Sequence, residues 1–229
     1  MNSRILVWDL PTRIFHWCLV VSFAVAFLTA ESERWRGIHV LSGYAVLYLM
    51  AFRLLWGFAG SRYARFAEFV RGPQTILRYL NGMVGGRPEH YVGHNPLGAV
   101  AILALIVLGI GSSLTGWLVY DELGGEWMEE LHESISNGML VAVVVHVLGV
   151  MASSKLHHQN LVLAMVTGKK PGEAKDAIPR PRALVAIFLV AGLVALCAWT
   201  LGRQEAINQP VGISDHESEQ TNAWKWDDD

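Results

Sequence analysis

Five long apolar blocks constrain this chain more than any other feature of its sequence. They run over residues 14–30, 38–58, 97–119, 131–153 and 183–201. A helix needs about 20 predominantly apolar residues to cross the hydrocarbon core of a bilayer. Only 17% of the 229 residues are charged, whereas about a quarter are charged in a soluble domain. The sequence therefore predicts an all-α membrane protein with five transmembrane helices.

Prolines mark where several of these helices begin. Pro11 acts as a breaker before the first block, and we expect Thr12 to be its N-cap. Pro96 precedes the third block, and Pro179 and Pro181 separate the fourth from the fifth. The N-terminal sequence lacks the basic start, apolar run and small-residue cleavage site of a secretory signal, so the first block is expected to remain as a helix.

The distribution of charge predicts how the helices are oriented. With the N-terminus in the cytoplasm, the outer segments hold only Arg34, Arg36, Arg203 and Lys225 of the 18 Lys and Arg residues. The positive-inside rule therefore predicts a cytoplasmic N-terminus and a periplasmic C-terminus in a bacterial inner membrane. Most of the 20 acidic residues lie in the outer segments and in the polar C-terminal tail. Residues 63–83 alternate arginines with apolar side chains, as an amphipathic segment on the inner membrane surface does.

Four histidines lie on the apolar blocks at two matching depths. His132 and His146 are fourteen residues apart on the fourth block, so a helix places them ~21 Å apart and within ~40° of the same direction. His16 begins the first block at the depth of His146, and His39 begins the second at the depth of His132. Ionisable groups in a membrane are costly unless paired. We therefore predict two pairs, His16–His146 near the inner face and His39–His132 near the outer face. The alternative is that these histidines only hydrogen-bond neighbouring helices.

Two imidazoles per site suit haem iron better than other metals. Structural zinc requires four ligands, and copper would lack a thiolate or thioether at a suitable spacing. Haem supplies four equatorial nitrogens and needs only two axial ligands from the protein. No C-x-x-C-H motif occurs, so the sequence predicts two non-covalent haems b suited to electron transfer. Cys18 and Cys197 lie within apolar blocks and are expected to be buried hydrophobes.

Three arginines are candidate partners for the anionic haem propionates. Arg13 and Arg36 each precede a histidine by three residues, and Arg53 lies at the inner end of the second block. The alternative for each is an ordinary snorkelling or positive-inside arginine. The other histidines are expected to be surface residues; they are His90, His94, His157, His158 and His216. Candidates for proton exchange are Asp9, His157 and His158 inside, and Asp121, Glu130 and Glu133 outside.

Eight stretches between residues 4 and 170 carry a family resemblance in the same order along the chain. They are WDLPTRIFHW (8–17), HVLSGY (39–44), FRLLWG (52–57), GHNPLG (93–98), LTGW (114–117), LHESISN (131–137), VHVLGV (145–150) and HQNLVLAMVTGKK (158–170). With these stretches the sequence resembles the bacterial di-haem cytochrome b-561 family, which includes the b-type subunit of nickel–iron hydrogenases. The resemblance implies haem ligation by His16, His39, His132 and His146, exchange of electrons with quinone, and an outer-face redox partner. The fifth block and the acidic tail depart from the four-helix members.

The sequence thus predicts a di-haem transmembrane domain at 1–170, a linker and fifth helix at 171–202, and an acidic flexible tail at 203–229. The expected function is electron transfer between the quinone pool and a periplasmic partner such as a c-type cytochrome. The sequence leaves open whether this subunit itself has quinol or quinone oxidoreductase activity. Other expected partners are membrane lipid and a second copy of the chain, but not nucleic acid. The alternatives are a superoxide oxidase that reduces quinone and a histidine-based metal-ion or proton transporter.

Overall fold

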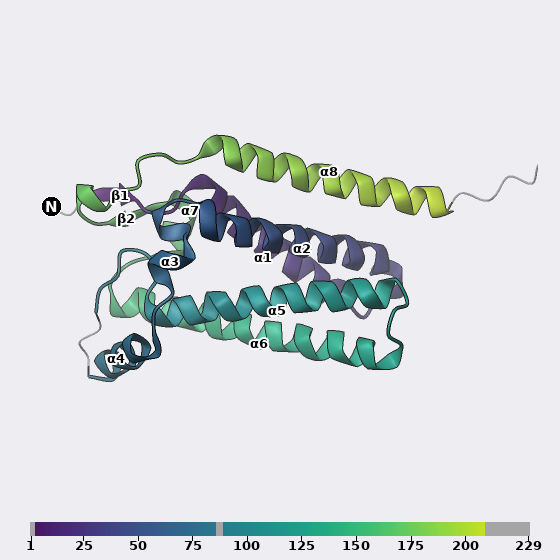
Figure 1. Ribbon diagram of the computed structural model, residues 1–229, viewed down its shortest axis with the longest axis horizontal. Coiled ribbons are helices and arrows are strands. Elements are labelled where there is room, and N and C mark those ends of the chain that lie inside the picture. Colours follow the sequence, from purple (N-terminus) through teal and green to yellow (C-terminus); the bar gives the residue numbers. More distant parts are fainter. Residues whose placement is uncertain (1–2, 86–88, 209–229) are drawn as a thin grey trace, which may run out of the picture.

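Five long apolar helices run side by side in the computed structural model, which describes residues 3–85 and 89–208 (Figure 1). They are α1 (Leu10–Thr29), α2 (Arg36–Ala59), α5 (Pro96–Tyr120), α6 (Glu126–Leu156) and α8 (Ala183–Asn208). Each contains a segment long and apolar enough to cross a membrane. The prediction of an all-α membrane fold with a fifth, C-terminal span is confirmed.

The first four of these helices pack in chain order. Helix α1 packs on α2, α2 on α5 and α5 on α6. Val46 and Met50 of α2 meet Ile106 of α5 and Met139 of α6 in the middle of the bundle. A side chain at Gly109 would lie 2.5 Å from the Met50 methyl group, so this glycine allows α2 and α5 to approach. In the described part of the chain, α6 has no comparably extensive packing against α1 or α2.

Helix α8 lies along the outside of the bundle against α1 and α2 (Figure 1). Leu189 of α8 packs with Phe15 and Leu49. The Tyr48 hydroxyl donates a hydrogen bond to the Leu189 carbonyl oxygen at 3.2 Å, and Gly192 leaves the room that this hydroxyl occupies. The fifth span is therefore an integral part of the helical assembly.

Large apolar side chains cover the outside of the helices. Leu28, Phe58, Val107, Val141 and Phe188 are each more than 60% exposed. Such a surface would be unfavourable in water but matches the hydrocarbon core of a bilayer. The chain is a multi-pass membrane protein.

Short elements gather at one end of the bundle, which we call the capped end (Figure 1). They are β1 (Arg4–Leu6), η2 (Arg62–Ala64), α3 (Phe66–Phe69), α4 (Pro73–Val84), α7 (Leu161–Thr167), β2 (Lys169–Pro171) and η3 (Ala174–Asp176). The other end, which we call the opposite end, contains η1 (Glu33–Trp35) and the connection between α5 and α6. Residues 63–83, which were predicted to be an amphipathic segment, include α3 and α4. In α4 the Tyr79 side chain is buried and the Leu77 side chain is exposed.

A two-stranded sheet joins the N-terminal segment to the segment that follows α7. Strands β1 and β2 are antiparallel, with Ile5 opposite Lys170. Just before β2, Gly168 has a φ of 79°, and its carbonyl oxygen accepts hydrogen bonds from the backbone of Val7 and Trp8. A Cβ at Gly168 would lie 2.6 Å from the Trp8 carbonyl oxygen, so glycine satisfies both the backbone angle and the close approach.

The N-cap of α1 differs from the prediction. The cap is Asp9, whose carboxylate accepts a hydrogen bond from the Thr12 backbone N–H at 2.8 Å. Thr12 lies within the first turn, and Pro11 is a first-turn residue and not a breaker. This position suits proline because a first-turn residue needs no intrahelical N–H bond. The prediction of Thr12 as N-cap is therefore wrong.

Candidate functional site

The rings of His39 and His132 face each other near the opposite end of the bundle. Their centroids are 6.2 Å apart and their planes are inclined by 86°. A metal–imidazole bond is about 2 Å long, and each nitrogen lies about 1 Å from its ring centroid, so two rings on opposite sides of one metal have centroids about 6 Å apart. The two side chains come from α2 and α6, which do not otherwise pack extensively.

Hydrogen bonds hold both of these rings by the same nitrogen. The His39 Nδ1 lies 2.8 Å from the Ala26 carbonyl oxygen, and the His132 Nδ1 lies 3.0 Å from the Ser112 carbonyl oxygen. A carbonyl oxygen only accepts, so each Nδ1 carries the proton and each Nε2 keeps its lone pair. Ala26 is in the last turn of α1, where carbonyls lack helical partners. This tautomer is the one that histidine adopts when Nε2 binds a metal.

Glycines make room around these histidines. A Cβ at Gly116 would lie 2.8 Å from the His132 ring, so this glycine lets the ring pack against α5. Gly43 follows His39 by one helical turn, and Gly149 follows His146 by three residues. A Cβ at Gly43 or Gly149 would meet no atom within 4 Å, so open space lies beside both positions.

His16 and His146 lie toward the capped end of the bundle. His16 is in the second turn of α1 and His146 is ten residues before the end of α6. The two rings lie within electrostatic range of each other. The His16 ring packs edge-on against Trp17 at a centroid distance of 5.1 Å. Its Nδ1 is buried and has no hydrogen-bond partner among the described residues.

Unpaired buried polar atoms cluster at this end of the bundle. Among the described residues, every buried side-chain nitrogen or oxygen without a partner comes from the starts of α1 and α5 or the end of α2. These atoms are Thr12 Oγ1, Arg13 Nε, His16 Nδ1, Arg53 Nη1, Ser61 Oγ and His94 Nδ1. Leaving a buried polar group unpaired costs about 1–3 kcal/mol. A bound polar or anionic group would satisfy the donors among these atoms.

The buried Arg53 side chain is held in place by two aromatic rings. It is 5% exposed, and its guanidinium lies 5.0 Å from the Phe66 ring centroid and 5.7 Å from that of Phe69. The carboxylate of Asp9 lies within electrostatic range and balances its charge. Arg13 lies on the facing helix, where its Nη1 donates to the Val166 carbonyl oxygen at 2.7 Å. Arg36 is exposed in the first turn of α2 at the opposite end.

His94 was predicted to be an ordinary surface residue, and this prediction is wrong. Its ring lies between Trp8 and Phe69, with centroid distances of 4.5 and 4.8 Å. Burial, together with the nearby Arg53 and Lys170, lowers the pKa of His94 to about 3, so the ring is neutral. The signal in the sequence was the GHNPLG stretch, in which the next residue, Asn95, caps α5 through the Gly98 N–H.

The candidates for proton exchange differ in burial and in hydrogen bonding. Asp9 is fully buried and its carboxylate already accepts hydrogen bonds from Thr12 and Trp56. His158 is exposed in a left-handed backbone conformation with a φ of 50°. His157 contacts Tyr79, whose hydroxyl lies 3.5 Å from the His157 Nε2. Asp121, Glu130 and Glu133 are exposed at the opposite end.

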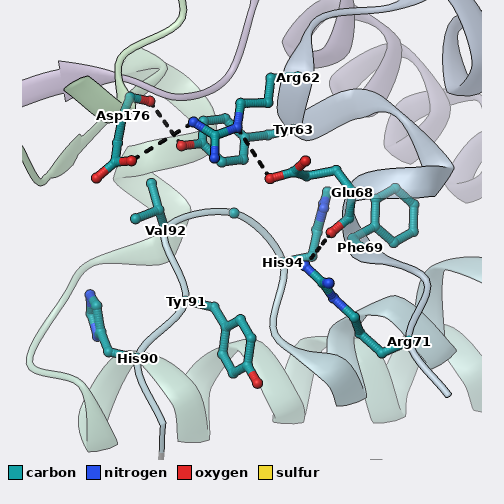
Figure 2. Close-up of a pocket in the computed structure, with 11 residues that line it drawn as sticks. Arg62, Tyr63, Glu68, Phe69, Arg71, His90, Tyr91, Val92, His94 and Asp176 are labelled. Carbon is teal, nitrogen blue, oxygen red and sulfur yellow. Dashed lines mark hydrogen bonds and ion pairs between the residues drawn. The ribbon is translucent and has the colours of Figure 1, made fainter. Parts of the chain in front are cut away.

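A polar cleft of about 170 Å³ opens at the capped end (Figure 2). Arg62 on one side forms ion pairs with Glu68 at 3.2 Å and Asp176 at 3.8 Å. His94 lies beside Phe69 on the other side, and His90 lines the cleft farther along the same loop. Lys170 anchors this loop, because its Nζ donates a hydrogen bond to the Val92 carbonyl oxygen at 2.7 Å.

The fold and this site define a helical, multi-pass membrane protein with paired histidines inside its bundle. Residues 7–168 match the family model described as prokaryotic cytochrome b561. The chain belongs to the prokaryotic cytochrome b561 family. The family implies membrane electron transfer by b-type haem, as expected from the sequence.

The chain is similar to proteins named as probable Ni/Fe-hydrogenase B-type cytochrome subunits. That of Rhodobacter capsulatus is 22% identical over 74% of this chain and 82% of the relative. That of Azotobacter vinelandii is 26% identical over 73% and 88%. The Escherichia coli K12 subunit of hydrogenase 1 is 25% identical over 51% and 60%. No solved structure matches the chain significantly.

Proposed function

We propose that this protein carries electrons across a membrane with two non-covalent haems b, between quinone and a redox partner at the opposite end. His39 and His132 would bind one haem near that end, and His16 and His146 the other near the capped end. A haem with two imidazole ligands supplies one-electron redox chemistry and has no open position on its iron.

The observation that carries this proposal is the geometry of His39 and His132. With 6.2 Å between their centroids, both imidazoles would be able to bind the same iron. Their Nδ1 atoms are bonded to backbone carbonyls, which leaves both Nε2 atoms for a metal. The open space beside Gly43 offers room for a macrocycle next to His39. The residues therefore fit haem.

The capped end fits a second haem for a different reason. Its unpaired Arg13 Nε and Arg53 Nη1 are donors that suit propionate carboxylates. The open space beside Gly149 supplies room next to His146. Arg36, one turn before His39, would meet the propionates of the other haem. Haem propionates would thus supply acceptors for donors that the protein leaves unpaired.

We propose that the capped end faces the cytoplasm of a bacterial inner membrane. The basic side chains exposed around it include Arg65, Arg71, Arg78, Lys155 and Lys169, and the positive-inside rule favours this orientation. Residues 1–170 would form the di-haem domain, and 171–202 the linker and fifth helix. The acidic tail proposed for 203–229 falls outside the described residues from residue 209 onward.

The opposite end suits a basic redox partner. Its exposed carboxylates outnumber its exposed arginines, Arg34, Arg36 and Arg203; they belong to Glu31, Glu33, Asp121, Glu122, Glu126, Glu129, Glu130 and Glu133. The names of the relatives support a redox enzyme as the partner, and a c-type cytochrome is the other candidate. A superoxide oxidase would instead need a positive surface to attract its anionic substrate.

Electron transfer to a basic c-type cytochrome is therefore expected to slow as salt rises. Attraction between opposite charges increases the association rate, and ions screen it beyond about 10 Å at 0.1 M salt. We expect the second-order rate constant, measured by stopped flow, to fall about tenfold or more between 10 and 200 mM salt. Uncharged redox mediators serve as the control, because the rates at which they exchange electrons with the protein should not depend on salt. A rate constant for the cytochrome that is independent of salt would contradict electrostatic steering.

Haem content and redox titration test the proposed function directly. We expect the purified protein to bind two haems b per chain and to show two redox transitions. Quinol or quinone should exchange electrons with these haems in purified membranes, as followed by the α bands. One haem per chain would contradict the two-site proposal, and a colourless protein would favour a histidine-based transporter.

A further inference from the structure

The polar cleft at the capped end is suited to hold water. Its arginines are already paired, because Arg62 binds Glu68 and Asp176, and Arg71 donates to the Glu68 carbonyl oxygen at 2.6 Å. The cleft therefore has little need of an anionic ligand. A cleft of about 170 Å³ has room for several water molecules. Water in the cleft reaches His90, which lines it.

From His90, polar side chains continue toward the bundle. The rings of His90 and His157 have centroids 5.4 Å apart. The His157 Nε2 lies 3.5 Å from the Tyr79 hydroxyl oxygen. Tyr79 is only 1% exposed, so its hydroxyl lies inside the protein. An aromatic hydroxyl buried in this way usually has a polar partner.

Asn95 links Tyr79 to the end of α6. The Asn95 side chain lies near the Tyr79 hydroxyl. The Asn95 Nδ2 donates to the Ser153 Oγ at 3.3 Å, while its Oδ1 accepts from the Gly98 N–H at 2.7 Å. The two hydroxyls of Tyr79 and Ser153 therefore flank one amide. One water molecule can bridge two hydroxyls that flank the same amide.

Ser153 lies on the same face of α6 as His146. It follows His146 by seven residues, so two helical turns place both side chains on one face of α6, about 10 Å apart. Gly149 lies between them on this face, and a Cβ there would meet no atom within 4 Å. The polar side chains that begin at the cleft therefore end about two helical turns from His146, a proposed haem ligand, and Gly149 is exposed between Ser153 and His146.

We propose that His157, Tyr79 and Ser153 form the route by which protons pass between the aqueous cleft and quinone at the capped end. This inference rests on the proposed exchange of electrons with quinone. Reduction of one quinone takes up two electrons, supplied by the partner at the opposite end, and two protons from the cleft. Each carbonyl oxygen of the quinone gains one O–H bond. Oxidation of quinol would release the same protons along the same residues.

The protonation state of His157 suits this role. Burial, with smaller contributions from the neighbouring His90 and Lys170, lowers the pKa of His157. Burial also lowers the pKa of Lys170 to about 8. The His157 ring is therefore neutral at neutral pH and can accept a proton from one side and release it to the other. Tyr91 packs against the Tyr79 ring, with their centroids 5.8 Å apart.

Replacing Tyr79 by phenylalanine tests the route, because this change removes only the hydroxyl. We expect Tyr79→Phe to lower quinone reduction and the accompanying proton uptake about tenfold or more. Reduction of the haems by a soluble one-electron mediator should stay at the rate of the unmodified protein. The full-length protein in proteoliposomes would be assayed with a short-chain ubiquinone analogue and a pH dye on the side of the capped end. Ser153→Ala provides a second variant, with the same expected result.

Tyr91→Phe is the matched control, since its hydroxyl binds Glu89 at 2.6 Å and lies outside the route. If Tyr79→Phe and Ser153→Ala reduced quinone as fast as Tyr91→Phe, the route would be wrong while the proposed function stood. Proton uptake from the opposite end would also overturn the route. If the unmodified protein bound haem but exchanged no electrons with quinone, both proposals would fall.

Discussion

The His132→Ala protein is expected to bind one haem where the unmodified protein binds two. His132 and His39 would together hold one haem, and the substitution leaves only His39 to hold it. A haem held by a single imidazole in an enlarged cavity binds far more weakly, whereas the capped end, about 21 Å away along α6, keeps its ligands. We expect haem content per chain to fall by about half, with loss of one of the two redox transitions. Pyridine haemochrome assays and optical redox titration measure both quantities.

The pairing of the histidines makes this prediction sharper. His39→Ala should leave the same spectrum as His132→Ala, while His16→Ala and His146→Ala should both leave the other spectrum. His158→Asn is the control, because His158 is exposed and asparagine tolerates its φ of 50°. That variant should keep both haems. If His146→Ala removed the same species as His132→Ala, the proposed pairs would be contradicted.

The five spans could be predicted because their signal is local. Each block is long, apolar and bounded by prolines or charges, so hydropathy alone places it within a few residues. The depth of the histidines also follows from counting along a helix, and the facing of His39 and His132 agrees with that count. Periodicity cannot supply the hydrogen bonds that orient these rings. The Ala26 and Ser112 carbonyls come from other helices, and only the packed bundle brings them near.

The capped end could not be predicted in the same way, because it is built from contacts between distant segments. Strand β1 pairs with residues more than 160 positions away, and no alternation in so short a stretch indicates a sheet. His94 resembled a loop residue until Trp8 and Phe69 were placed on either side of it. For the same reason, nothing in the sequence indicates that Asp9, a candidate for proton exchange, is fully buried.

Asp9→Ala is expected to destabilise the capped end strongly. This change removes the N-cap of α1, the acceptor for the Trp56 indole N–H at 3.1 Å, and the carboxylate that balances buried Arg53. A lost N-cap costs about 1 kcal/mol, leaving the buried Trp56 N–H without its acceptor costs about 1–3 kcal/mol, and the charge of buried Arg53 loses its nearby counter-charge. These losses share one carboxylate and are not additive, so we expect at least about 3 kcal/mol in total. Thermal unfolding in detergent, followed by circular dichroism, should show a clearly lower midpoint.

The conservative variant separates the charge from the hydrogen bonds. Asp9→Asn can still cap α1 through its side-chain oxygen but no longer balances Arg53, so its midpoint should fall between those of Asp9→Ala and the unmodified protein. Asp176→Asn is the matched control, since its carboxylate pairs with Arg62 at the surface at 3.8 Å, where such pairs contribute about 0–1 kcal/mol. If Asp9→Asn were as stable as Asp176→Asn, the Asp9 charge would contribute little, and Arg53 would have to be balanced otherwise. Because Arg53 is also a proposed propionate partner, the same variants should weaken haem retention at the capped end before they affect the haem held by His39 and His132.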